Sequence, residues 1–398
     1  MEEVTNCRRC NSTDIVKEGA FALVNPYWDT QKYLCNSCNR NFNVRVPKGL
    51  IKKPELNRNL TVQNILNETK KEFSWPAYNE SQKQEKLIFL EILDSLCSHI
   101  PDEPEGKMGR PSARFREMIF CIVTKLYEGL STRIVCSDLT IAMEKGYIAK
   151  VPNPNTLIKY FNQPQCIAVL TDLIRLSAMP LKGFETTFSV DATGLSSAFY
   201  SRWFDHRFGK EDEKKDWRKI HLICGNKTHI VTAIVITDGK SHDSPQFCEL
   251  VNKTAEHFRI LEVCADKAYS SRKNVQAVAD VGGTPIIPFR SNSTGRSLGS
   301  KVWNKLFYYT QYHGDEFTTR YGKRNNVEGT FSSLKRKFST KLLCKNEIAQ
   351  VNECLAMVLC LNICILVRAL FEHAIETNFE EFAHIFRSLN IKSTQVLK

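Results

Sequence analysis

Residues 186–194 read TTFSVDATG, a β-rich run that carries Asp191 shortly before its closing glycine. Threonine, phenylalanine and valine favour strands and Gly194 interrupts the run, so we predict a strand here with Asp191 near its end. Similar runs follow, separated by amphipathic stretches. We predict further strands at 218–225, 229–237, 260–269 and 284–289, and helices at 244–258 and about 271–280. This alternation is typical of an α/β sheet.

Acidic residues occupy selected positions in this pattern. Asp191 and Asp266 close two of the predicted strands. Ligands of α/β sheets usually bind at the carboxyl ends of the strands. A third acid, Glu328, lies in YGKRNNVEGTFSSLK (321–335), a segment with the apolar spacing of a helix and mostly basic neighbours. A lone carboxylate in such a segment would suit a divalent cation held against a polyanion.

The composition points to nucleic acid as a partner. The 398 residues include 55 lysines and arginines against 43 aspartates and glutamates, a formal charge of +12 and a pI near 9.0. This balance favours a polyanion, although an ordinary basic cytosolic protein can share it. The 15 cysteines mostly lie singly in apolar runs, as reduced thiols do.

No membrane or export signal is predicted. The N-terminus MEEVTNCRRC lacks the basic and apolar regions of a signal peptide. The longest apolar run, 354–367, is short for a membrane span and is predicted to be a buried core helix. We therefore expect a cytoplasmic, nucleoid-associated protein.

Four cysteines near the N-terminus have metal-ligand spacing. Two Cys-x2-Cys pairs, Cys7 with Cys10 and Cys35 with Cys38, flank a strand-like stretch. Four thiolates in this arrangement suit a tetrahedral structural zinc ion, and the strands suit a zinc ribbon. The alternative is four unrelated thiols. Basic residues around the pairs would serve either a DNA contact or a solvated surface.

The segment 108–182 is predicted to be helical. Its apolar spacing, Gly129, Gly146 and a start at Pro154 or Asn155 indicate three short helices joined by tight turns. These fit a helix-turn-helix DNA-binding unit, and a plain helical bundle fits them equally well. The predicted organisation of the chain is a zinc ribbon (1–48), a linker with one helix at 83–99 (49–107), a helical DNA-binding region (108–182), a catalytic α/β domain (183–375) and a C-terminal tail (376–398).

The helix with Glu328 carries a longer signature. Tyr321, Arg324, Glu328 and Lys335 are separated by two, three and six residues. This pattern resembles the Tyr-Arg-Glu-Lys signature of the DDE transposases of prokaryotic insertion sequences. SVDATG and ADKAYSSR resemble the blocks around that family's two aspartates. The resemblance covers roughly 108 to 370.

The resemblance implies a fold and a set of roles. It implies a ribonuclease-H-like catalytic domain in which Asp191, Asp266 and Glu328 hold two Mg²⁺ ions, or Mn²⁺, for phosphodiester cleavage. It implies that Arg324 forks onto a phosphate, that Lys335 acts as a point charge on the strand, and that Tyr321 contacts DNA near the cut. The alternative for Arg324, Glu328 and Lys335 is a set of exposed helix pairs.

Three functions fit these observations. The first is a transposase that cleaves element ends and joins the 3′-hydroxyl to target DNA, acting as a homodimer because two ends must be held together. The second is a metal-dependent nuclease or resolvase without strand joining. The third is a non-catalytic DNA-binding protein, against which the three acids argue.

Overall fold

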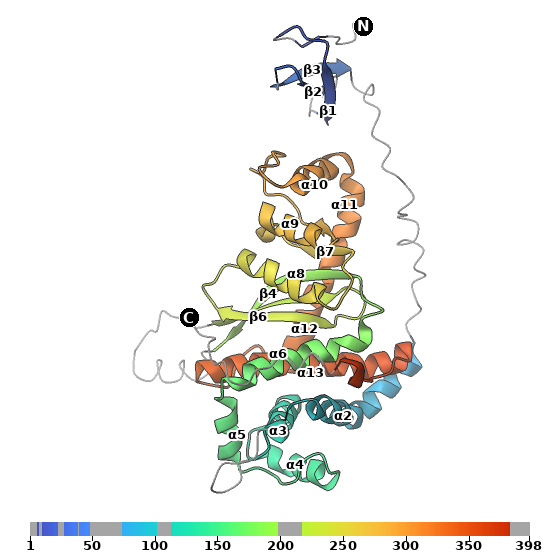
Figure 1. Cartoon of the computed structure of the whole chain (residues 1–398). Helices are drawn as coiled ribbons and strands as arrows, with labels where there is room; N and C mark the ends of the chain where they lie inside the picture. The colour runs from blue at the N-terminus through green and yellow to red at the C-terminus, as the bar shows by residue number, and fades with distance from the viewer. Residues whose placement is uncertain are drawn as a thin grey trace. The chain divides into compact units, whose positions relative to one another are not determined.

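The computed structural model describes residues 6–7, 10–22, 28–38, 40–47, 74–101, 113–197 and 217–382 (Figure 1). The chain divides into two compact units, Met1–Phe73 with Gln311–Gly314, and Ser74–Thr310 with Asp315–Lys398. Parts of the predicted linker, at 49–73 and 102–107, and residues 383–398 of the predicted tail lie outside the described residues.

The N-terminal unit contains a three-stranded antiparallel sheet. Its strands are β1 (Ile15–Ala22), β2 (Trp28–Cys35) and β3 (Arg40–Pro47), in that order across the sheet. The register of β1 against β2 shifts between Lys17 and Gly19. Cys35 ends β2, opposite Ile15 at the start of β1, so the stretch between the two cysteine pairs contains strands, as predicted.

The second unit is built around a five-stranded sheet in the order β6-β5-β4-β7-β8. β4, β5 and β6 are antiparallel, whereas β7 runs parallel to β4 and β8 parallel to β7. The central strand is therefore β4. The strands are β4 (Thr187–Ser196), β5 (Trp217–Gly225), β6 (Val231–Asp238), β7 (Glu262–Ala265) and β8 (Thr284–Ile286).

A buried acid fixes the hairpin between β5 and β6. Glu185 is fully buried and accepts hydrogen bonds from the backbone N–H of Lys227 at 3.1 Å and of Thr228 at 2.6 Å. A Cβ atom added at Gly225 would lie 2.2 Å from Cδ of Glu185, so only glycine fits there. The turn at Gly225 and Asn226 is thus held against the start of β4.

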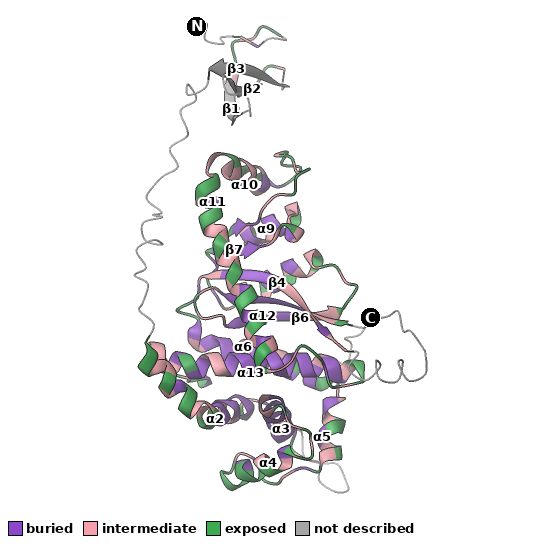
Figure 2. Cartoon of the chain, turned by 180° about the vertical axis from the view of Figure 1, so that it is seen from behind, coloured by how far each residue is buried: buried purple, intermediate pink, exposed green. Residues whose placement is uncertain are grey.

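Helices cover both faces of the sheet. α8 (Phe247–Ala255) packs on β5 and β6, and α12 (Asn325–Lys337) packs on β4 and β5. Figures 1 and 2, seen from opposite sides, place α8 and α12 on opposite faces. The other elements between β6 and α12 along the chain are η2 (Ser244–Gln246), η3 (Lys267–Tyr269), α9 (Arg272–Asp280), α10 (Lys301–Tyr312), α11 (Gly314–Tyr321) and η4 (Gly322–Arg324).

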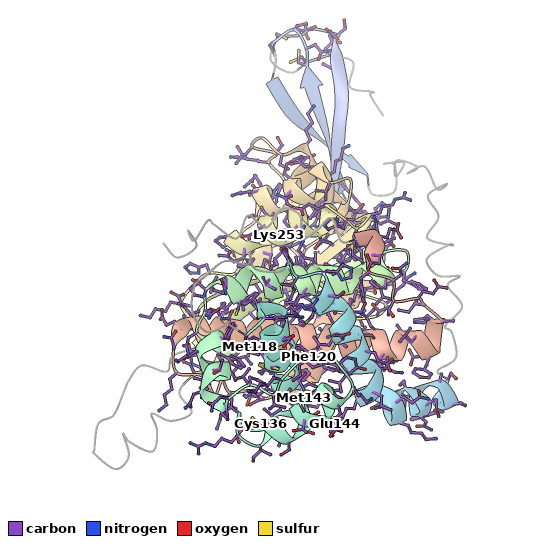
Figure 3. The ribbon with its side chains drawn as sticks, turned by 60° about the horizontal axis from the view of Figure 1, so that its bottom comes forward. Met118, Phe120, Cys136, Met143, Glu144 and Lys253 are labelled. Atoms are coloured by element: carbon purple, nitrogen blue, oxygen red, sulfur yellow. The ribbon has the colours of Figure 1, made fainter. Side chains whose placement is uncertain are left out.

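The remaining helices form a layer joined to the sheet through α6 (Gln165–Ala178) and the long helix α13 (Glu347–His373). α13 lies between the sheet and the helices α2 and α3, and also packs on α6 (Figure 1). Figure 3 shows Met118 and Phe120 of α3 inside this layer and Met143 and Glu144 of α4 near its rim. The layer comprises α2 (Trp75–Ser98), α3 (Phe115–Glu128), α4 (Val135–Glu144), α5 (Pro154–Phe161), α6 (Gln165–Ala178) and η1 (Met179–Leu181).

α13 contains the apolar run noted in the sequence. Within the described residues it is the helix long and apolar enough to cross a membrane, with a mean hydropathy of 2.5 over its most apolar window. In the structure, 72% of that window is buried, and Figure 2 shows the helix mostly buried. The prediction of a core helix is confirmed.

Candidate active site

The register of β4 and β7 brings two aspartates together. The parallel pairing of these strands ends at Val190 opposite Ala265, so Asp191 and Asp266 are the next residues on neighbouring strands. Adjacent strands lie about 4.8 Å apart, and laterally adjacent side chains point to the same face. β4 continues through Gly194 to Ser196, so the expectation that Asp191 sits near the end of its strand is wrong. It is β7 that stops beside it.

Each aspartate is fixed by a backbone N–H. Oδ1 of Asp266 accepts a hydrogen bond from the N–H of Ala268 at 2.7 Å and caps η3, which explains why β7 is shorter than predicted. Oδ1 of Asp191 accepts from the N–H of Ala192 at 2.8 Å. The other oxygen of Asp191 accepts from Nη2 of Arg324 at 2.9 Å.

Arg324 also reaches the third acid. Its Nη1 donates to Oε1 of Glu328, one turn further along, so one guanidinium bridges Asp191 and Glu328. The side chain of Glu328 is 54% exposed, whereas those of Asp191 and Arg324 are largely covered. One guanidinium therefore contacts two of the three acids that the sequence pattern singled out.

The charges of the three acids act on one another. Burial raises the pKa of Asp191, and the charges of Asp266 and Glu328 raise it further. The hydrogen bond from the N–H of Ala192 and the charge of Arg324 lower it. Burial also raises the pKa of Tyr321, with Asp266 and Asp191 adding to the rise and Arg324 opposing it. The five residues thus share one electrostatic site.

The three carboxylates are not gathered around a common point. Among the residues that the structure describes, groups of His, Cys, Asp and Glu with donor atoms all within 4.8 Å comprise the N-terminal cysteines alone. Between Asp191 and Glu328 lies the guanidinium of Arg324. The donor set still suits a hard divalent cation, because it offers only oxygen ligands and its like charges raise the pKa of Asp191.

A buried acid that sequence reasoning missed anchors the segment before Arg324. Glu262 of β7 is 3% exposed and accepts hydrogen bonds from Nε and Nη2 of Arg320 at 3.0 and 2.7 Å. Nζ of Lys323 lies 3.3 Å from its other oxygen. Lys323 therefore supports the fold, although the sequence suggested a group free to hold a polyanion. All four residues of β7 are buried, so no polar–apolar alternation in the sequence marks Glu262 as an inward-facing acid.

The start of α12 is also attached to the β5–β6 turn. Nδ1 of His229 lies 3.0 Å from the carbonyl oxygen of Asn326, which can only accept, so this nitrogen carries the proton. Nδ2 of Asn326 donates to the carbonyl of Asn226 at 2.9 Å, and Thr330 lies 3.1 Å from the same His229 nitrogen. Through Asn326, these bonds set where Glu328 projects. No local sequence pattern predicts these bonds.

The remaining members of the signature lie at the two ends of this segment. Tyr321 ends α11 and stacks on Phe317, with ring centroids 6.1 Å apart. The 3-10 turn η4 separates it from α12, so it does not continue the helix of Glu328 as expected. Lys335, in the last turn of α12, makes no ion pair or hydrogen bond with any other described residue. Its ammonium is available to a ligand.

The four N-terminal cysteines form a compact cluster. Sγ of Cys7 lies 3.8 Å from that of Cys38, and Sγ of Cys10 lies 3.5 Å from that of Cys35. Tetrahedral zinc with Zn–S of about 2.3 Å would hold its sulfurs about 3.8 Å apart, so the spacing fits. Burial and the other thiols raise the pKa of Cys38 to about 12, a penalty that a bound cation would remove.

Fold and site together define an α/β domain with an acidic, arginine-bridged site beside the ends of its parallel strands. Residues 182–363 match the family model described as "Transposase DDE domain". This span includes Asp191, Asp266 and Glu328. The match supports a DDE transposase and a role in DNA transposition.

A solved structure also resembles this chain. It is described as the cryo-EM structure of the piggyBac transposase synaptic complex with hairpin DNA. The two chains share 11% sequence identity with a TM-score of 0.38, over 78% of this chain and 82% of that chain.

Proposed function

We propose that this protein is a transposase that binds the ends of an insertion sequence, cleaves phosphodiester bonds there and joins the freed 3′-hydroxyl ends to target DNA. The observation that carries the proposal is the placement of Asp191, Asp266 and the Arg324–Glu328 pair at the carboxyl end of β7. The match of residues 182–363 to a transposase domain supports it. The strand order and directions suit a ribonuclease-H-like domain.

Asp191, Asp266 and Glu328 would hold two Mg²⁺ or Mn²⁺ ions. When bound, such ions supply Lewis acidity and an activated nucleophile for phosphodiester cleavage. The carboxylates would supply only oxygen ligands. Asp191 would contribute its Oδ2 once Arg324 releases it, and Glu328 is exposed enough to move toward its partners.

The basic residues would hold the DNA strand. Arg324 presents a planar guanidinium that can exchange a carboxylate for a phosphate with the same two-pronged geometry. Lys335, without a described protein partner, would bind a phosphate further along α12 as a point charge. Tyr321, half-buried beside Arg324 and Asp191, would contact the strand near the cut.

Other parts of the chain would assist binding and assembly. The cysteine cluster would hold a structural zinc ion within a zinc ribbon (1–48), and the helical region (108–182) would bind DNA through its short helices. The catalytic domain would span 183–375, after the linker (49–107) and before the tail (376–398). Two copies would hold two element ends in a homodimer, in the cytoplasm at the nucleoid.

A joining assay tests the proposal. The full chain is mixed with Mg²⁺, linear DNA that carries the sequences flanking its own gene, and a supercoiled target plasmid. We expect joined product, and we expect none from Asp191→Asn, which should still bind DNA. Cleavage without joining would identify a nuclease or resolvase. Binding without cleavage would identify a DNA-binding protein, and normal cleavage by Asp191→Asn would refute the site.

A further inference from the structure

A second candidate site lies beside the turn that follows Asp266. A cavity of about 370 Å³ opens there, lined by hydroxyl, amide and guanidinium groups and by one indole ring. No acidic residue lines it. The lining includes Ser270, Ser271, Arg272, Arg290, Thr294 and Trp303.

The cavity has a rigid frame. Trp303 is 4% exposed, and its ring lies 4.6 Å from that of Phe289. Its Nε1 donates to the carbonyl of Thr294 at 2.8 Å, and Asn304 donates to the carbonyl of Gly295 at 2.6 Å. The loop on one side of the cavity is therefore fixed to α10, so little ordering is needed when a ligand binds.

Two arginines bring uncompensated positive charge to this frame. The guanidinium of Arg272 lies over the Trp303 ring, 4.7 Å from its centroid, and donates to the carbonyl of Arg296. Arg290 donates to the carbonyls of Lys267 and Ala268. In the described part of the chain, neither guanidinium forms an ion pair with a carboxylate. Both are oriented by neutral acceptors and keep their full charge.

The neighbouring groups suit an anion with several oxygens. Ser271 caps α9, whose N-terminus carries partial positive charge, and accepts from the N–H of Asn274 at 3.2 Å. The hydroxyl of Ser270 is buried and has no hydrogen-bond partner among the described residues. Arginines, serine hydroxyls and a helix N-terminus are the groups that contact phosphate oxygens in protein–DNA complexes.

We propose that this cavity binds a backbone phosphate of the DNA strand that enters the active site. The inference rests on the proposed function, because it takes DNA as the ligand. Arg290 links the two sites: it holds the carbonyls of the turn whose N–H at Ala268 fixes Asp266. A phosphate bound at Arg290 would therefore position the strand a short distance from Asp266, on the side away from Lys335.

The test compares two pairs of charge removals in the full chain. Arg272→Gln with Arg290→Gln removes both arginines from the cavity. Lys273→Gln with Lys305→Gln removes two exposed charges from α9 and α10 outside its lining. Dissociation constants for a 30-base-pair duplex are measured by fluorescence anisotropy from about 50 to 200 mM salt.

The expected result is a change in the salt dependence. Each lost phosphate contact lowers the magnitude of the slope of log K against log salt by about 0.9, so the arginine pair, which removes one phosphate contact, should lower it by about 0.9 and the lysine pair by less than half a unit. Equal changes in both pairs, or no change with the arginine pair, would overturn the proposal. Arg272→Gln alone, which keeps Arg290 on the turn after Asp266, should lower the magnitude of the slope by about half as much as the pair does.

Cleavage separates this proposal from the function it rests on. At low salt and saturating protein, the lysine pair Lys273→Gln with Lys305→Gln should cut DNA at nearly the wild-type rate, because neither residue lines the cavity or belongs to the active site. If Asp191→Asn cuts normally while Arg272→Gln lowers the slope, the proposed active site is wrong and the phosphate site stands. If Asp191→Asn is inactive and the slope of Arg272→Gln is unchanged, the phosphate site is wrong.

Discussion

The chain carries two sets of metal-ligand side chains that are organised in opposite ways. The four thiols of Cys7, Cys10, Cys35 and Cys38 lie within 4.8 Å of one another. The carboxylates of the active site do not, and a guanidinium lies between Asp191 and Glu328. The four thiols are already gathered without a metal. The carboxylates are instead bridged by the guanidinium of Arg324.

The difference follows from what each set would do. A structural zinc ion takes four protein ligands and leaves no position open, so its ligands must be gathered by the fold. A catalytic Mg²⁺ takes one or two carboxylates and fills its other positions with water and substrate oxygens. Bringing three acids together without a cation would cost free energy, and in the proposed site Arg324 would lower that cost before metal and DNA bind.

Zinc removal should have the largest effect. Binding of structural zinc contributes about 10–16 kcal/mol to the folding of small zinc domains, so a chelator should unfold β1–β3. The sheet around β4 contains none of these cysteines and should stay folded. Limited proteolysis and circular dichroism check this, with zinc or magnesium added back separately. Zinc should restore protection of residues 6–47 and magnesium should not, and a ribbon that stays protected without zinc would contradict the comparison.

Glu262→Gln should have the next largest effect, because the active site depends on an anchored segment as well as on its acids. The substitution leaves Arg320 and Lys323 without their buried carboxylate. Loss of one partner of a buried pair costs about 3–5 kcal/mol, and we expect about 2–3 here because both cations are partly exposed and can be rehydrated. Urea denaturation measures the change.

The matched control is Glu316→Gln, which removes a more exposed carboxylate 3.9 Å from the same Arg320. Its effect should stay below about 0.5 kcal/mol. Similar losses for the two variants would show that Glu262 does not anchor this segment.

Arg324→Gln should make the carboxylate set, like the thiol set, able to bind a metal ion without another ligand. Without the guanidinium, Asp191 and Glu328 lack their shared cation and should bind Mn²⁺ about tenfold more tightly in the absence of DNA, equivalent to about 1.4 kcal/mol. Mn²⁺ titration followed by electron paramagnetic resonance measures this. DNA cleavage should fall at the same time, since the phosphate loses a bidentate partner. Unchanged or weaker Mn²⁺ binding would show that Arg324 does not compete with the metal.

Much of this arrangement could be predicted from the sequence because it depends on local patterns. The strands around Asp191 and Asp266 follow from runs of β-branched residues, and the helix of Glu328 follows from its apolar spacing. Gly129 ends α3 at a φ of 67°, as predicted, because a helix that ends at a left-handed residue favours glycine. The two Cys-x2-Cys pairs fixed the thiol cluster in the same way.

The rest depends on contacts that no local pattern encodes. The role of Lys323 follows from Glu262, 61 residues earlier, and Lys337 likewise bonds Glu85, 252 residues earlier. A basic residue beside the signature could therefore not be assigned to DNA or to the fold without knowing which buried acid it meets.

The smallest expected effect concerns the histidine that holds the start of α12. Burial lowers the pKa of His229, the carbonyl of Asn326 opposes this, and the charge of Arg368 lowers it further. A histidine whose folded pKa is depressed contributes stability above its unfolded pKa, about 6.5, and loses it as pH falls.

At pH 7.5 the wild type should be more stable than His229→Gln by about 1 kcal/mol, the value of a typical hydrogen bond. The difference in unfolding free energy should shrink as pH falls toward 5.5, since glutamine does not titrate and the other histidines are common to both proteins. A difference that stays constant over this range would mean that His229 is not held neutral against α12, and that the position of Glu328 is set without it.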